Sequence, residues 1–134
     1  MNTLDFSVIL ERWPELLQGT IATLGLALAG MALAMVIGVL GVAIRRSGNR
    51  LGAAIVVGFV EIIRNTPFLV QIFFIFFALP LAGVRLNPTT TSIIALGLNG
   101  GAYAIEIIRG GVESIPRGQT EAGMALGLHQ GEIF

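Results

Sequence analysis

The sequence predicts an all-α, polytopic membrane helix bundle with three spans. Three long stretches carry no acidic or basic side chain, namely residues 16–44, 65–84 and 86–105. A helix rises about 1.5 Å per residue, so roughly 20 residues cross the hydrocarbon core of a bilayer, and each stretch reaches that length. The chain is 54% hydrophobic and only 12% charged, with a mean hydropathy of +0.85. Soluble domains place charges along one face of such helices, and these stretches have none.

Residues 1–18 are predicted to form an outer interfacial segment. They mix apolar side chains with Glu11, Arg12 and Glu15, and Trp13 favours the headgroup region of a bilayer. A frayed tail is the alternative. No basic region precedes the first apolar run, which argues against a cleaved secretory signal and indicates an uncleaved first span.

The transmembrane domain is predicted to occupy residues 19–112, with spans near 19–44, 55–84 and 86–108. The first span is rich in glycine and alanine, which let helices approach closely. In the second, Pro67 lacks a backbone donor and predicts a kink or a helix start near the inner boundary. The residues from 51 to 60 are also apolar, so the second span has an earlier, tilted or interfacial extension as an alternative start.

The third span is unusually polar, with Asn99 and Tyr103 among its threonines and glycines. Polar groups at membrane depth need a neighbour or a wet cavity. Two interpretations therefore stay open for this face. It lines a pathway, or it serves helix–helix hydrogen bonding and glycine packing.

Arginine positions predict the orientation of the spans, because arginines beside spans tend to stay cytoplasmic. Six arginines fall on one predicted side: Arg45, Arg46, Arg50, Arg64, Arg109 and Arg117. Only Arg12 and Arg85 fall on the other. We therefore expect an external N-terminus and a cytoplasmic C-terminus.

The tetrapeptide Glu-Ile-Ile-Arg occurs twice, at 61–64 and 106–109. In each copy the glutamate and arginine are three residues apart on a helix, close enough to pair. Both copies are expected near the inner interface, because the second and third spans run in opposite directions. Pairing with arginine snorkelling is one interpretation. The other is that Glu106 or Glu61 senses a charged substrate or holds a gate.

No catalytic, cofactor or metal site is predicted. The chain has no cysteine, and its single histidine, His129, lies outside the spans. No GxxxxGK[ST] phosphate loop is present, so this chain is not expected to bind ATP by that route. Eight basic and eight acidic residues cancel, which gives no field that favours nucleic acid. An enzyme is not expected.

Residues 113–134 are predicted to form a cytoplasmic segment with a short helix of its own. Pro116 and Gly118 are expected to break the preceding long helix, Thr120 or Gln119 to start the new one, and Gly127 to end it. This predicts an amphipathic knob whose small side chains let a partner's backbone come close. A surface helix resting on the inner leaflet is the alternative.

The run Glu121-Ala-Gly-Met-Ala-Leu-Gly127 resembles the "EAA" loop of ABC importer permeases, which reads Glu-Ala-Ala, three residues, then Gly. Residues 19–24, 61–67 and 102–116, together with Gln71, resemble the polar amino-acid branch of that family, which includes histidine, glutamine and arginine uptake permeases. The similarity runs from about Gly19 to the last residue.

This resemblance implies a membrane translocation subunit of an ATP-driven importer of polar amino acids in the bacterial inner membrane. It implies five spans per subunit, a second permease subunit, separate ATPase subunits and an extracytoplasmic amino-acid-binding protein. The EAA helix would dock on the ATPase through Glu121, Ala122, Gly123 and Gly127. We expect the substrate pathway to involve Gln71, Asn99, Tyr103 and Glu106.

The chain departs from the family pattern in two places. Gly123 replaces the second alanine, which lowers the helix propensity of the coupling helix by up to about 1 kcal/mol. The sequence also stops at Phe134, before the family's Ile-x-Leu-Pro segment and last two spans, so we expect a C-terminally incomplete permease. A passive channel or membrane assembly protein, or a truncated permease without function, are the alternatives.

Overall fold

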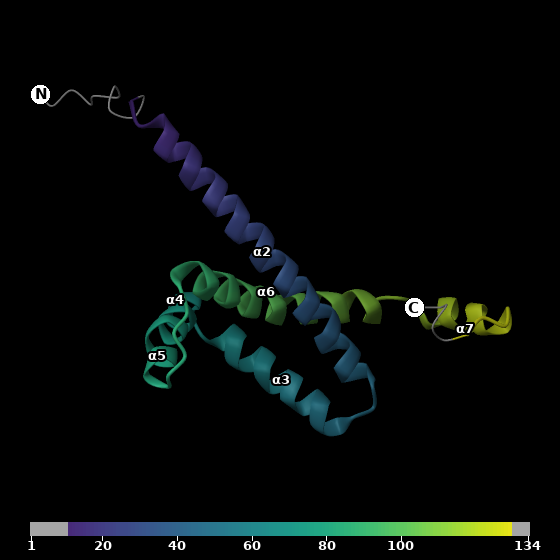
Figure 1. The fold of residues 1–134 in the computed structure, drawn as a ribbon. Helices are drawn as coiled ribbons and strands as arrows, with labels where there is room; N and C mark the ends of the chain where they lie inside the picture. The colour runs from purple at the N-terminus through teal and green to yellow at the C-terminus, as the bar shows by residue number, and fades with distance from the viewer. Residues whose placement is uncertain (1–10, 130–134) are drawn as a thin grey trace, which may run out of the picture.

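A computed structural model describes residues 11–129, and these contain helices, turns and loops but no strand (Figure 1). The all-α prediction is thereby confirmed for this range. The elements in chain order are α2 (Trp13–Arg46), α3 (Arg50–Asn65), α4 (Phe68–Phe73), the π-helical turn η1 (Phe74–Ala78), α5 (Leu79–Leu81), α6 (Pro88–Glu113) and α7 (Arg117–Ala125).

The predicted interfacial segment 1–18 is only partly covered by the described residues. Its first ten residues lie outside them, and Trp13 to Gln18 form the first turns of α2 rather than a separate helix. Residues 130–134 of the predicted coupling segment also lie outside the described range.

Within residues 11–129, two helices are long and apolar enough to cross a bilayer, α2 and α6. A third crossing exists only if α3 and the run from Phe68 to Leu81 count together, and these are bent by 108° at their break. The predicted span 55–84 is therefore not one straight helix. It begins earlier, at Arg50, and breaks at Pro67, where the kink was predicted. Thr66 is extended (φ −108°, ψ 129°), as expected for a residue before proline.

Glycines bring α2 and α6 into close contact along most of α6. A Cβ atom added to Gly97 of α6 would lie 2.4 Å from Leu33 Cδ2, and one added to Gly41 of α2 would lie 2.5 Å from Ile105 Cδ1. A larger residue fits such gaps only if the facing side chain or its helix moves, which is how small residues permit close helix packing in membranes. Similar contacts join Gly30 to Leu96, Gly38 to Ala104 and Gly101 to Ile37. Residue numbers rise together along both helices, so α2 and α6 run parallel.

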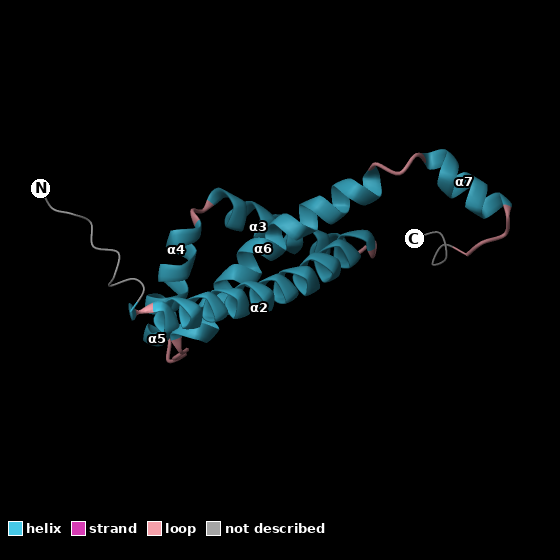
Figure 2. Ribbon diagram, turned by 90° about the horizontal axis from the view of Figure 1, so that it is seen from above, coloured by secondary structure: helices cyan, strands magenta, loops and turns pink. Residues whose placement is uncertain are grey.

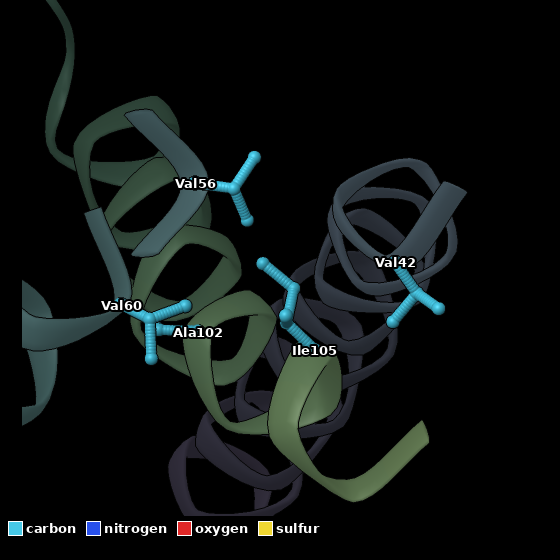
Figure 3. Packing of buried hydrophobic residues seen from close by; sticks show 5 residues of the cluster. All are labelled: Val42, Val56, Val60, Ala102 and Ile105. Atoms are coloured by element: carbon cyan, nitrogen blue, oxygen red, sulfur yellow. The ribbon is translucent and has the colours of Figure 1, made fainter. Parts of the chain in front are cut away.

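α3 packs against the C-terminal halves of both long helices. The buried core of the described residues lies where the three helices meet, with Ile105 of α6 between Val42 of α2 and Val56 and Val60 of α3 (Figure 3). Ile105 is only 1% exposed. The rest of α2 presents large apolar side chains outward, such as Leu28, which is 66% exposed. A helix that is apolar on its outer face suits contact with lipid or other helices.

α7 extends beyond the end of α6 and away from the three packed helices (Figures 1 and 2). It begins at Arg117, three or two residues before the predicted starts at Thr120 and Gln119, because Pro116 takes the N-cap position and accepts a hydrogen bond from Gln119 N. Gly118, which was expected to help break the long helix, lies inside α7 instead.

The predicted end of α7 at Gly127 is confirmed. Gly127 has φ +79°, in the left-handed region that glycine adopts at little cost. Its N–H donates to Met124 O, and Leu128 N–H donates to Gly123 O. These two bonds form a Schellman motif, which satisfies the last carbonyl groups of the helix.

Candidate functional site

Three of the four predicted pathway residues lie on one face of α6. Asn99, Tyr103 and Glu106 are spaced by four and three residues, which places them in a stripe along a helix. This stripe contacts α3 and α4, whereas Gly97 and Gly101 contact α2. The fourth residue, Gln71 of α4, hydrogen bonds to the stripe. The structure thus joins Gln71 to Asn99, while Tyr103 and Glu106 lie further along the same face of α6.

Gln71 bridges the break between α3 and α4. Its Nε2 donates to Ile63 O and to Thr66 O, each at 2.8 Å, and its Oε1 accepts from Asn99 Nδ2 at 3.2 Å. Pro67 has no N–H to donate to Ile63 O, which accepts instead from Thr66 N–H at 3.3 Å. Gln71 is 7% exposed and adds a second donor to Ile63 O and a side-chain donor to Thr66 O. Both amide hydrogens of this side chain are therefore engaged within the protein.

Tyr103 lies beside the end of α3 and is 45% exposed. The Arg64 guanidinium carbon lies 5.4 Å from the centroid of the tyrosine ring, a cation–π distance. Glu61, Arg64, Asn65 and Tyr103 line an open cavity of about 320 Å³. The aromatic ring, an amide and both signs of charge thus share one cavity.

Glu106 joins three helices through its carboxylate. Arg45 Nη1 of α2 lies 2.6 Å from Oε1, Arg109 Nη2 of α6 lies 2.8 Å from Oε2, and Arg64 Nη1 of α3 lies 4.0 Å from Oε2. The Glu106 side chain is 23% exposed, so part of its hydration is lost on folding. Charge-assisted hydrogen bonds compensate for that loss. Arg109 also pairs with Glu113, which extends the cluster along α6.

The predicted pairing within the two Glu-Ile-Ile-Arg copies forms in only one of them. Glu106 pairs with Arg109, but Glu61 is exposed and forms no ion pair with any residue from 11 to 129. Arg64 contacts Tyr103 and Glu106 instead. Sequence analysis missed Arg45 and Arg64 as partners of Glu106. Arginine positions indicated a side of the membrane, and only the helix packing decides which arginines reach one carboxylate.

The predicted coupling residues lie at the surface of α7 and its C-cap. Glu121, Ala122 and Gly127 are exposed and Gly123 is half-buried, and no residue of α7 is buried. Glu121 forms no hydrogen bond or ion pair within the described part of the chain. These positions are accessible to a partner, and their role in coupling stays a prediction.

Acidic, histidine and cysteine side chains do not cluster for metal binding. Within residues 11–129, no three of them are placed to hold a metal ion.

Comparison with known proteins matches residues 30–134 to a family described as "Binding-protein-dependent transport system inner membrane component". The glutamine transport system permease protein GlnP of Escherichia coli K12 is 42% identical over 132 residues, which are 97% of this chain and 60% of that protein. The histidine/lysine/arginine/ornithine transport system permease protein HisQ of the same strain is 35% identical over 130 residues, covering 89% and 57% respectively.

A solved structure is also similar, described as "Crystal structure of an amino acid ABC transporter with histidines". It superposes with a TM-score of 0.90 at 30% identity and covers 98% of this chain and 61% of that one. The chain thus spans about 60% of the length of these relatives.

Proposed function

This chain belongs to the family of inner membrane components of binding-protein-dependent transport systems, and we propose that it is the translocation subunit of an ATP-driven importer of polar amino acids. Relatives named for glutamine and for histidine, lysine, arginine and ornithine support the substrate class. The proposed partners are separate ATPase subunits, a second permease subunit and an extracytoplasmic amino-acid-binding protein. In the proposed orientation the N-terminus is outside the bacterial inner membrane and the C-terminus is cytoplasmic.

The observation that carries this proposal is the exposure of α7. This nine-residue helix stands beyond the ends of α2 and α6, has no buried residue, and presents Glu121, Ala122 and Gly127 to the surroundings. An exposed helix with small side chains and a defined C-cap suits insertion into a cleft of another protein. We assign that cleft to the ATPase subunit, which would hydrolyse ATP on its own chain.

The packing of α6 provides a mechanical route from α7 to the proposed pathway. Only residues 114–116 separate α7 from α6, and α6 carries Asn99, Tyr103 and Glu106. The glycine contacts and the Arg45–Glu106 ion pair hold α6 against α2. A movement of a docked α7 would therefore displace α2 and α6 together. ATP binding could then favour one of two access states, as in other rigid-body switches.

Within the pathway, the contacts suggest different roles for the four residues. Gln71 has both amide hydrogens engaged, so its proposed role is to position Asn99. Tyr103 is the most exposed of the four and is proposed to contact the substrate. Glu106 is held by arginines from three helices, and its proposed role is to keep the inner end of the pathway closed in this conformation.

Co-purification with an ATPase subunit of an amino-acid importer tests the coupling assignment. Glu121→Lys should remove ATPase recovery by reversing a charge at the docking surface. Gly127→Asp should reduce it, because aspartate strains the left-handed C-cap by about 1 kcal/mol. Glu15→Lys is the matched control, since it reverses an exposed charge at the opposite end of α2. Unchanged ATPase recovery with both α7 variants would show that the coupling assignment is wrong.

Uptake of labelled amino acids in the same strains separates an importer from a passive channel. We expect uptake that requires ATP and that is lost in Glu121→Lys. Tyr103→Ala should raise the KM for uptake while leaving ATPase recovery unchanged. Uptake that continues without ATP would favour the channel alternative, and absence of uptake with an intact ATPase complex would favour a non-transporting membrane assembly protein.

A further inference from the structure

A basic cleft lies where the C-terminal ends of α2 and α6 meet the N-terminus of α7. It has a volume of about 460 Å³. Four arginines line it, Arg45, Arg46, Arg109 and Arg117, together with Glu113. Glu106 pairs with two of them, Arg45 and Arg109. Guanidinium groups gathered in one concave site attract anions, and phosphate in particular matches the geometry of guanidinium donors.

Two of these guanidinium groups are held in position before any ligand arrives. Glu106 binds Arg45 at 2.6 Å and Arg109 at 2.8 Å. A guanidinium group has five N–H donors, and Arg45 gives only one of them to Glu106, so it has donors left for an anion. Fixing the side chains in advance lowers the conformational entropy lost on binding.

The first turn of α7 contributes to the same cleft through Arg117 and Thr120. No side chain caps this helix end, since Pro116 occupies the N-cap position. The free N–H groups at a helix N-terminus carry partial positive charge and favour an anion. This feature adds to the four arginines.

The cleft also has apolar walls and a position that suits a lipid. Both helices that are long enough to cross a bilayer, α2 and α6, end at this cleft. Val42, Val112 and Ile115 line it beside the arginines. A free phosphate ion needs only the basic groups, whereas a phospholipid places a phosphate beside acyl chains at this depth. Basic pockets between membrane helices are suited to anionic lipid headgroups.

We propose that this cleft binds the phosphate of an anionic phospholipid headgroup, with phosphatidylglycerol as the representative ligand. The site would anchor the ends of α2 and α6 and the start of α7 to one leaflet. The proposal rests on α2 and α6 spanning a membrane. It does not require that the chain transports amino acids, so it can fail or hold independently of the proposed function.

Native mass spectrometry of the full chain, titrated with phosphatidylglycerol or phosphatidylcholine, tests this proposal. We expect the parent protein to bind one phosphatidylglycerol more tightly than phosphatidylcholine. The double variant Arg46→Gln with Arg117→Gln removes two cleft charges and keeps Arg45 and Arg109, which bind Glu106, and it should weaken phosphatidylglycerol binding by about tenfold or more. The matched control, Arg12→Gln with Arg85→Gln, removes two exposed arginines elsewhere and should change it less than about twofold.

Photolabelling and competition by inorganic phosphate test the same proposal independently. A photoreactive phosphatidylglycerol should label the parent protein at the ends of α2 and α6 or at the start of α7, which tests the site without any substitution. Inorganic phosphate should compete only weakly with the lipid. Equal binding of both lipids, equal loss in the two double variants, labelling confined to other segments, or tight binding of inorganic phosphate alone would each overturn the proposal.

Discussion

The two Glu-Ile-Ile-Arg segments have the same sequence and helical conformation but different ion pairs. In both, the first isoleucine is exposed, Ile62 at 68% and Ile107 at 72%, and the second is half-buried. In α6, Glu106 forms ion pairs with Arg109, Arg45 and Arg64. In α3, Glu61 faces outward beside a cavity, and its neighbour Arg64 reaches across to α6.

A glutamate and an arginine at positions i and i+3 of a helix are close enough to form an ion pair, but this spacing does not ensure that the pair forms. An exposed pair of this kind contributes little free energy, typically a few tenths of a kcal/mol. A second helix that brings another charge within reach therefore decides which pairs form. Because α2 and α3 both end near Glu106, that carboxylate gains two further arginines, whereas Glu61 gains none among residues 11–129.

The largest expected effect in this comparison comes from Glu106→Gln. This change keeps the size of the side chain but removes the charge that holds Arg45 and Arg109. Among the described residues, it leaves Arg45 and Arg64 without a carboxylate partner and Arg109 with Glu113 alone. We expect the free energy of unfolding to fall by about 1–3 kcal/mol, the range for hydrogen bonds to charged groups. Denaturant unfolding in mixed detergent micelles measures it. A loss below 0.5 kcal/mol, on the order of an exposed pair, would contradict the proposed importance of the cluster.

A smaller effect is expected from Arg64→Gln. Arg64 is 45% exposed and its distance to Glu106 is 4.0 Å, so its ion pair is screened by solvent. With the added contact to the Tyr103 ring, we expect a loss of about 0.5–1 kcal/mol. A double-mutant cycle with Glu106→Gln measures the coupling directly. Zero coupling would mean that Arg64 does not stabilise Glu106, and that Arg45 and Arg109 alone hold this carboxylate.

The smallest effect on stability is expected from Glu61→Gln. This carboxylate forms no ion pair with the described residues, so the free energy of unfolding should change by less than about 0.5 kcal/mol. The same unfolding assay measures it, with Glu106→Gln as the matched substitution at the equivalent position of the other segment. A loss as large as that of Glu106→Gln would indicate that Glu61 has a partner which this conformation does not display.

Much of the fold could be predicted because it depends on local chemistry. Pro67 and Pro116 mark helix boundaries since proline has no N–H to donate, and Gly127 ends α7 since it alone tolerates φ +79° there. Uncharged stretches of 20 residues or more predicted the long helices, and α2 and α6 have that length. The start of α7 differs from the prediction of Thr120 or Gln119, because Pro116 takes the N-cap position and the helix begins at Arg117.

The candidate site was predictable as a set of residues but not as a set of contacts. The residue pattern alone shows that polar side chains occur in an apolar helix and need partners, because an unsatisfied polar group in hydrocarbon is costly. Helix packing determines that Gln71 Nε2 donates to the carbonyl groups of Ile63 and Thr66, and that three arginines meet at Glu106. Those choices depend on the 108° bend and on glycine contacts that place α2 parallel to α6, and neither is encoded within a single helix.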